Sequence, residues 1–101
     1  MIVYNVTVNI DKSVHDEWLN WMKTAHIPDV MRTGLFKENR LLRVLGDEDS
    51  GGFTYSIQYT LESMEKFRHY EDVYAPALRG EFNVKYKDKF VAFRTLLESV
   101  D

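Results

Sequence analysis

The stretch that decides the fold spans residues 2–10 and reads IVYNVTVNI. Apolar and polar side chains alternate along it, and several are β-branched, a pattern typical of a half-buried β-strand. One face of this strand carries the apolar or aromatic residues Ile2, Tyr4, Val6, Val8 and Ile10. The opposite face carries Val3, Asn5, Thr7 and Asn9. The two faces of this strand are therefore expected to meet different surroundings.

Residues 53–60 alternate in the same way and predict another strand. Its apolar set is Phe53, Tyr55, Ile57 and Tyr59, and its polar set is Thr54, Ser56, Gln58 and Thr60. Residues 36–45 predict the strand before it, and the acidic, glycine-rich turn 46–52 joins the two into a hairpin. The polar sets of both alternating strands are uncharged, although a sheet face in bulk water normally carries lysine and glutamate. We therefore expect this polar face to be partly enclosed, for example between the sheets of two subunits.

A first helical segment follows the first strand. Asp11 or Ser13 is placed to cap it by accepting a hydrogen bond from a free backbone N–H. Apolar residues then recur at helical spacing, namely Val14, Trp18, Trp21, Met22 and Ala25. Pro28 is expected to kink or restart this helix, because its ring clashes with the preceding turn. Gly34 is a natural left-handed residue with which to end it.

A second helical segment begins after Ser63, which is a candidate N-cap. Pro76 breaks it and can begin a short third helix that buries Leu78 and Phe82. Residues 90–99 predict the last strand. The order of elements is therefore β-α-β-β-α-β.

This order predicts an α+β, ferredoxin-like fold in which residues 1–101 form a single domain. With right-handed crossovers, the four strands form an antiparallel sheet and the helices cover one face of it. The other face remains open.

Composition excludes several classes of function. The chain has 101 residues, 13 Lys+Arg against 16 Asp+Glu, a formal net charge of −3, and no cysteine. Disulfide scaffolds, thiolate zinc sites and cysteine nucleophiles are therefore excluded. No apolar run approaches the ~18 residues that a membrane span needs, and the chain opens on a strand pattern rather than a signal sequence. We expect a cytoplasmic protein with no membrane partner.

Several segments resemble an uncharacterised family of small bacterial proteins, a domain of unknown function in the dimeric α/β-barrel superfamily. The similar segments are residues 4–10, 18–22, 26–31, 34–36, 51–59 and 89–97. The spacing of Trp21, His26 and Pro28 is also similar to the Trp-x₃₋₄-His-x-Pro of EthD-like members. The resemblance implies a ferredoxin-like subunit that forms a homodimer, a dimeric α/β barrel. It leaves the activity open, because this superfamily hosts unrelated functions, among them monooxygenases and isomerases.

His26 is the candidate catalytic residue. It lies at the edge of the apolar helical stripe, just before Pro28, where the helix is expected to loosen. A neutral imidazole there is suited to act as a general base or to hydrogen-bond a ligand. The alternative is structural, since a cationic His26 would cap free carbonyls at a helix C-terminus.

Six further residues are candidates for binding a ligand: Asn5, Thr7, Trp21, Gln58, Tyr74 and Arg94. Trp21 is suited to stack on an aromatic ligand or to pack in the core. Tyr74 is suited to point its hydroxyl into a cavity near the Pro76 break or to be half-buried. Two alternating sets of residues make up the last strand, and the set without Arg94 (Val91, Phe93, Thr95 and Leu97) is the more apolar. Arg94 is therefore expected on the open side, near a carboxylate ligand or a glutamate. A buried cavity lined by Asn5, Thr7, Gln58, His26 and Arg94 would favour an enzyme or a ligand-binding protein over a purely structural module.

Metal, cofactor and nucleic-acid sites are not indicated. His15 and His26 are eleven residues apart, about 16 Å along a continuous helix, so they cannot share an ion. Residues 47–51 imitate the start of an EF-hand loop but lack its third oxygen ligand, so a solvated turn is expected. Residues 52–59 superficially resemble an RNA-recognition strand, but exposing their aromatics would bury Ser56 and Gln58, and no basic patch is present. We expect no cofactor and no RNA partner.

Three functions remain open from the sequence. The first is a dimer that binds a small organic molecule in a pocket between sheet and helices. The second is a cofactor-free, monooxygenase-like or isomerase-like enzyme that uses His26 as a general base. The third is a structural or partner-binding module without a ligand. No residue pattern decides whether the protein is an enzyme.

Overall fold

The computed structural model describes residues 1–46 and 50–101. Its four strands are β1 (Ile2–Asp11), β2 (Glu38–Arg43), β3 (Gly52–Leu61) and β4 (Phe90–Glu98). They form one sheet in the order β2-β3-β1-β4, with every neighbouring pair antiparallel. The solvated turn expected at 47–51 lies partly outside the described residues. The strand order is that of a ferredoxin-like α+β fold, as the sequence predicts.

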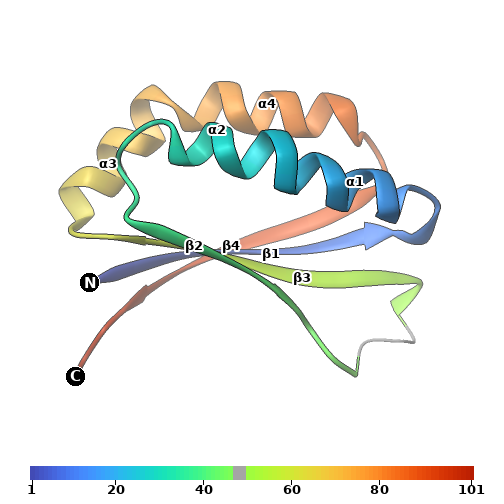
Figure 1. Cartoon of the computed structure of the whole chain (residues 1–101), viewed down its shortest axis with the longest axis horizontal. Helices are drawn as coiled ribbons and strands as arrows, with labels where there is room; N and C mark the ends of the chain where they lie inside the picture. Colours follow the sequence, from blue (N-terminus) through green and yellow to red (C-terminus); the bar gives the residue numbers. More distant parts are fainter. Residues whose placement is uncertain (47–49) are drawn as a thin grey trace.

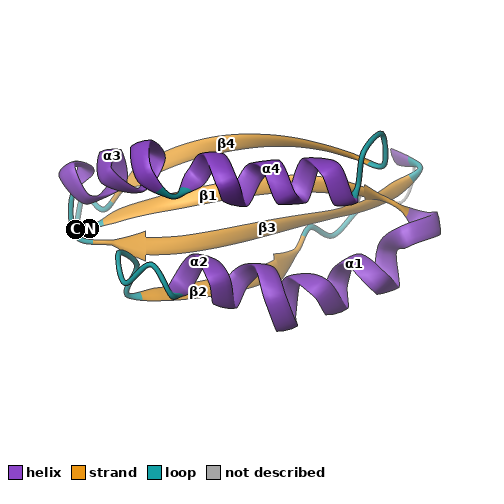
Figure 2. Ribbon diagram, turned by 90° about the horizontal axis from the view of Figure 1, so that it is seen from above, coloured by secondary structure: helices purple, strands orange, loops and turns teal. Residues whose placement is uncertain are grey.

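The helices lie together on one side of this sheet (Figure 1). A short 3₁₀ turn (Lys12–Val14) leads into α1 (His15–Trp21), a π turn (Met22–His26) and α2 (Ile27–Met31). The second arm consists of α3 (Met64–Val73) and α4 (Ala75–Lys85). Seen from above, α1 and α2 run over the side of β2 and β3, whereas α3 and α4 run over the side of β1 and β4 (Figure 2). None of the helices in the described part of the chain lies on the opposite face of the sheet.

Capping side chains fix where the helical segments begin. Asp11 accepts a hydrogen bond from the backbone N–H of Ser13 at 2.8 Å. Ser63 does the same for the N–H of Lys66 at 3.3 Å. Each cap satisfies a backbone donor that the first helical turn leaves free. Both residues were predicted as caps from the sequence.

The core lies between the sheet and the helices. Its fully buried members include Ile10, Trp18 and Leu61, which come from β1, α1 and β3. The apolar sets predicted for residues 2–10 and 53–60 both face this core, because the register sets Tyr4 opposite Tyr59. Phe36, which was predicted to begin a strand, instead packs into the core just before β2.

The prediction that Arg94 faces the open side is wrong. In the β1–β4 pairing Arg94 lies opposite Val6, and Phe93 lies opposite Thr7. Residues directly opposite each other share a face, so Arg94 is on the helix side and Phe93 on the open side. The apolar set of β4 was assigned to the core because it is the more apolar, yet it lies on the uncovered face. Val91, Phe93 and Leu97 are 70%, 63% and 45% exposed there.

Candidate functional site

A π turn places His26 at the junction of α1 and α2. Pro28 has no N–H, and its ring clashes with the carbonyl four residues earlier, so a regular α-helix cannot run through this point. The backbone responds one turn ahead, where the N–H of Ile27 bonds to the carbonyl of Met22, five residues back. The kink predicted at Pro28 is therefore a widened turn that ends at His26. Such π turns are frequent at functional sites.

The His26 ring is half-buried between aromatic side chains. It stacks on Trp21 at 4.9 Å between centroids, and it meets the edge of Phe82 at 5.4 Å. The pKa of His26 is lowered from 6.5 to about 4, mainly by burial and to a smaller extent by the Arg94 charge, while the charge of Asp29 opposes this shift. The imidazole is therefore neutral at pH 7, which does not fit the role of a cationic helix cap. No residue in the described parts of the chain hydrogen-bonds either ring nitrogen.

A cavity of about 30 Å³ lies between the helices and the sheet beside His26. That volume is enough for about one or two water molecules. Apolar side chains from both layers form most of the wall. The polar groups on the wall belong to Tyr4, His26, Tyr59, Tyr70 and Arg94. An apolar cavity with a few converging polar groups is the usual form of a small-molecule site.

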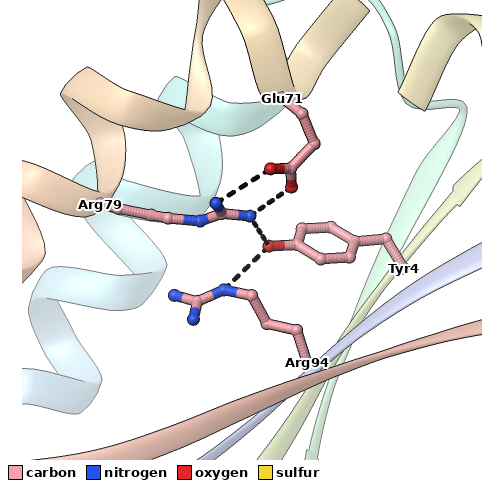
Figure 3. A network of polar contacts seen from close by, with 4 residues as sticks. All are labelled: Tyr4, Glu71, Arg79 and Arg94. Carbon is pink, nitrogen blue, oxygen red and sulfur yellow. Dashed lines mark hydrogen bonds and ion pairs between the residues drawn. The ribbon is translucent and has the colours of Figure 1, made fainter. Parts of the chain in front are cut away.

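The hydroxyl of Tyr4 is the centre of a polar cluster, which we call the Tyr4 cluster, formed by Tyr4, Glu71, Arg79 and Arg94 (Figure 3). Arg79 donates to the Tyr4 oxygen from Nη2 at 2.9 Å, and Arg94 donates to it from Nε at 3.1 Å. Arg79 also holds Glu71 with two bonds, one from Nη1 to Oε2 at 3.0 Å and one from Nη2 to Oε1. The cluster joins β1, β4, α3 and α4. Two guanidinium groups and one carboxylate leave it with a net charge of +1.

Burial and hydrogen bonding shift the pKa values around this cluster. Burial lowers the pKa of Arg79, but its bonds to Glu71 and Tyr4 outweigh that effect and raise it. Burial also raises the pKa of Tyr70 and of Tyr59, so both phenols stay protonated at neutral pH. The cavity therefore presents neutral hydroxyls, a neutral imidazole and a permanent cation.

The structure does not bring Asn5, Thr7 and Gln58 together with His26 and Arg94. Successive side chains of a strand point to opposite faces, and Asn5, Thr7 and Gln58 lie on the open face. There Asn5 donates to the Thr7 hydroxyl at 3.1 Å and accepts a hydrogen bond from the Ser56 hydroxyl. His26 and Arg94 lie on the other side of the sheet and line one cavity together.

Trp21 and Tyr74 lie outside the wall of this cavity. Trp21 is half-buried, and its ring stacks on that of His26 and also contacts the rings of Phe82 and Tyr86. Tyr74 is half-buried at the junction of α3 and α4, where its ring lies 5.9 Å from that of His69.

Sequence reasoning missed the roles of Tyr4, Glu71 and Arg79. The alternation of β1 predicts that Tyr4 is buried, and a buried tyrosine hydroxyl usually needs a partner, which was the available signal. The pair of Glu71 and Arg79 spans the break at Pro76, so helical spacing gives no indication that the two side chains meet. Arg94 also forms no ion pair among the described residues of this chain, although Glu38 and Glu98 were candidates.

Residues 1–46 and 50–101 contain no group of three His, Asp or Glu side chains placed to hold a metal ion. None of their helices has the length and apolar character needed to cross a membrane.

Comparison with solved structures places this architecture in the class of ferredoxin-like α+β proteins. A mutant of MhuD with two manganese protoporphyrin IX molecules bound per active site matches with a TM-score of 0.70 at 19% identity, over 100% of this chain and 96% of that one. An EthD family protein from Bacillus halodurans matches with a TM-score of 0.69 at 13% identity, over 99% of this chain and 100% of that one. A dimeric ferredoxin-like protein from an uncultured marine organism matches with a TM-score of 0.72 at 8% identity, over 100% and 96%.

A family model matches residues 1–100, and the chain belongs to that family, the domain of unknown function DUF4286. The resemblance found in the sequence is thereby confirmed. No curated protein matches the sequence. At these identities the solved structures establish the fold alone.

Proposed function

We propose that this protein is a homodimer whose subunits each bind a small organic molecule in the cavity between sheet and helices. One observation carries the binding proposal: His26 from the helical layer and Arg94 from the sheet line the same cavity, and neither is consumed by an ion pair within the described chain. Polar groups that converge on an apolar cavity from two layers are the usual determinants of ligand orientation.

The cavity must widen to admit a ligand, and β4 supplies the means. Arg94 and Leu96 are on the helix side, yet both are exposed, because no helix fully covers the edge strand there. An outward shift of the long Arg94 stem, with its guanidinium kept on the Tyr4 hydroxyl, enlarges the cavity at this edge without moving the backbone. A neighbour of the same fold binds metal porphyrins in its active site. The cavity here is far smaller, so we propose a ligand of the size of one ring or a short chain.

The state of His26 favours binding over proton transfer. A general base works best when its pKa lies near the working pH. Burial holds the pKa of His26 at about 4, so its conjugate acid is too acidic for an efficient base at pH 7. A neutral imidazole is instead suited to donate one hydrogen bond and accept another. Binding is therefore preferred to the alternatives of an isomerase or a monooxygenase.

We propose that the open face of the sheet forms the dimer interface. Val91, Phe93 and Leu97 form an exposed apolar row on β4, beside the uncharged residues Asn5 and Thr7 of β1. Contiguous exposed apolar residues mark an interaction site. Some neighbours of this fold are dimeric. A two-fold interface between two such faces would bury roughly 1,200–2,000 Å².

Native mass spectrometry of the purified protein tests the ligand and the dimer in one measurement. We expect a dimer mass and an additional small mass that is retained at low activation and lost at high activation. His26→Phe fills the cavity and should lose the additional mass, whereas His69→Phe alters an exposed residue of α3 and should keep it. A monomer, or an additional mass that His26→Phe retains, would contradict the corresponding half of the proposal.

A further inference from the structure

The Tyr4 hydroxyl has one proton, and no residue among 1–46 and 50–101 accepts it. A phenol oxygen accepts through its lone pairs and donates one O–H. Both acceptor positions of Tyr4 are taken, one by Arg79 and one by Arg94. Guanidinium groups have no acceptor, so neither arginine can receive the Tyr4 proton. Among the described residues no other group accepts it, and Tyr4 is on the cavity wall.

Arg94 adds further donors at the same place. Its Nε is bonded to Tyr4, while its two Nη groups have no partner among the described residues. Arg79 contributes charge but is otherwise engaged: both of its Nη groups hold Glu71, and its Nε is buried without a partner. The Tyr4 cluster thus offers the cavity hydrogen-bond donors and a net positive charge.

We propose that the molecule bound in the cavity is a small carboxylic acid with an apolar body, and that the Tyr4 cluster recognises the two oxygens of its carboxylate. One carboxylate oxygen accepts from the Tyr4 hydroxyl, and the other accepts from an Nη group of Arg94. Met22, Val30 and Phe82 of the cavity wall contact the apolar body. This inference rests on the proposed function, because it assigns a chemical class to the ligand of the same cavity.

The arrangement of hydrogen-bond donors also defines which classes of ligand should bind poorly. An amine or an ammonium group brings donors and positive charge to a site that already has both, and it is repelled. A primary amide offers one acceptor but also an N–H₂ that meets no acceptor in the cluster. A buried donor left without a partner is destabilising, so an acid should bind more tightly than its amide, by about fivefold or more.

Three probes with one apolar body test this selectivity: phenylacetate, phenylacetamide and phenethylamine. Binding is followed by chemical-shift changes in ¹H–¹⁵N spectra of the full chain, which also show that each variant is folded. We expect phenylacetate to shift resonances of β1, β4 and the π turn, with an affinity about fivefold or more above that of phenylacetamide, and phenethylamine to cause no saturable shift. Acetate, which lacks the apolar body, should bind more weakly than phenylacetate.

Two variants assign the selectivity to the cluster. Tyr4→Phe removes the donated proton and should reduce the preference for acid over amide by about fivefold or more. Arg94→Gln acts from the exposed edge strand and should reduce it as well, which keeps the test decisive if Tyr4→Phe fails to fold. Tyr74→Phe deletes a hydroxyl outside the cavity wall and should change nothing.

The outcomes separate this inference from the proposed function. Equal or tighter binding of phenethylamine, or an acid preference that survives in Arg94→Gln, overturns the inference. Absence of binding by all three probes also overturns it, while a small molecule retained in native mass spectrometry would leave the proposed function standing. If no probe binds and no mass is retained, both fail.

Discussion

Arg94 reaches Tyr4 diagonally across two antiparallel strands, although its direct partner in the β1–β4 register is Val6. Tyr4 lies opposite Leu96, two positions further along β4. Diagonal neighbours on one face are about 7–8 Å apart, a distance that only long side chains span. An arginine and a tyrosine meet this requirement. Their bond ties the edge strand to the sheet interior and fixes the polar end of the cavity.

The open sheet face provides the first prediction. Phe93→Glu places a charge in the exposed apolar row of β4, and a buried, unpaired carboxylate is too costly for the interface to tolerate. Light scattering at tens of micromolar should show a dimer for the wild type and a monomer for the variant. Val84→Glu is the matched control, since Val84 is 81% exposed on the helical side. A dimeric Phe93→Glu protein would place the interface elsewhere.

The pair of Glu71 and Arg79 provides the second prediction. Both side chains are about 30% exposed, and Arg79 also supports Tyr4. Glu71→Gln replaces a two-bond ion pair with a neutral group and leaves a half-buried guanidinium poorly satisfied. We expect the free energy of unfolding to fall by about 1–2 kcal/mol in urea denaturation. Glu65→Gln, an exposed change in the first turn of the same helix, should stay within about 0.5 kcal/mol of the wild type.

Two glycines of different surroundings provide the third prediction. A Cβ at Gly52 would lie 2.4 Å from the backbone oxygen of Ile10 and 2.7 Å from Oδ1 of Asn9. A Cβ at Gly80 in α4 meets nothing within 4 Å. Gly52→Ala should therefore destabilise the protein by about 2 kcal/mol or more, because backbone of β1 must move. Gly80→Ala should stabilise it by about 0.5–1 kcal/mol, as expected for alanine in a helix interior. Equal effects of the two changes on the melting temperature would contradict this account.

The sequence predicted the fold well where one face of a strand was plainly apolar. β1 and β3 have such faces, and their positions followed from alternation alone. β4 does not, because Phe90, Ala92 and Leu96 alternate with Val91, Phe93 and Leu97, so both of its faces are largely apolar. Its orientation depends on its register with β1, which the sequence does not contain.

The candidate site was predicted only in part, because some of its residues have a local signal in the sequence and others meet only through the packing of distant elements. His26 was found because Pro28 follows it, and a proline in a helix has a local, readable effect. Arg94 was found but assigned to the wrong face. The Tyr4 cluster was not found, because it joins residues up to 90 positions apart that meet only once α3, α4 and the sheet are packed.

His26 provides the last prediction, a dependence of stability on pH. Its pKa is 6.5 in an unfolded chain and about 4 in the folded protein, where burial disfavours the charged form. As the pH falls below 6.5, the unfolded chain binds a proton that the folded protein does not take up until about pH 4. The folded state therefore loses stability across this window, by up to about 3 kcal/mol for a shift of this size.

Urea denaturation of the wild type and of His26→Gln between pH 7 and pH 4 measures this loss. The wild type should lose stability steadily over that range, and the variant should show a flatter profile because it has no group to protonate at this position. His69→Gln, an exposed change, should keep the wild-type slope. The lowered pKa values of Asp11, through its bonds to Ser13, and of Glu62, through Lys66 and Lys37, act at the acid end of the range. Those carboxylates remain in all three proteins, so the difference between the curves reports His26. Parallel curves for the wild type and His26→Gln would show that the imidazole is not held neutral, and the argument for His26 as a neutral hydrogen-bonding group in the cavity would fail with it.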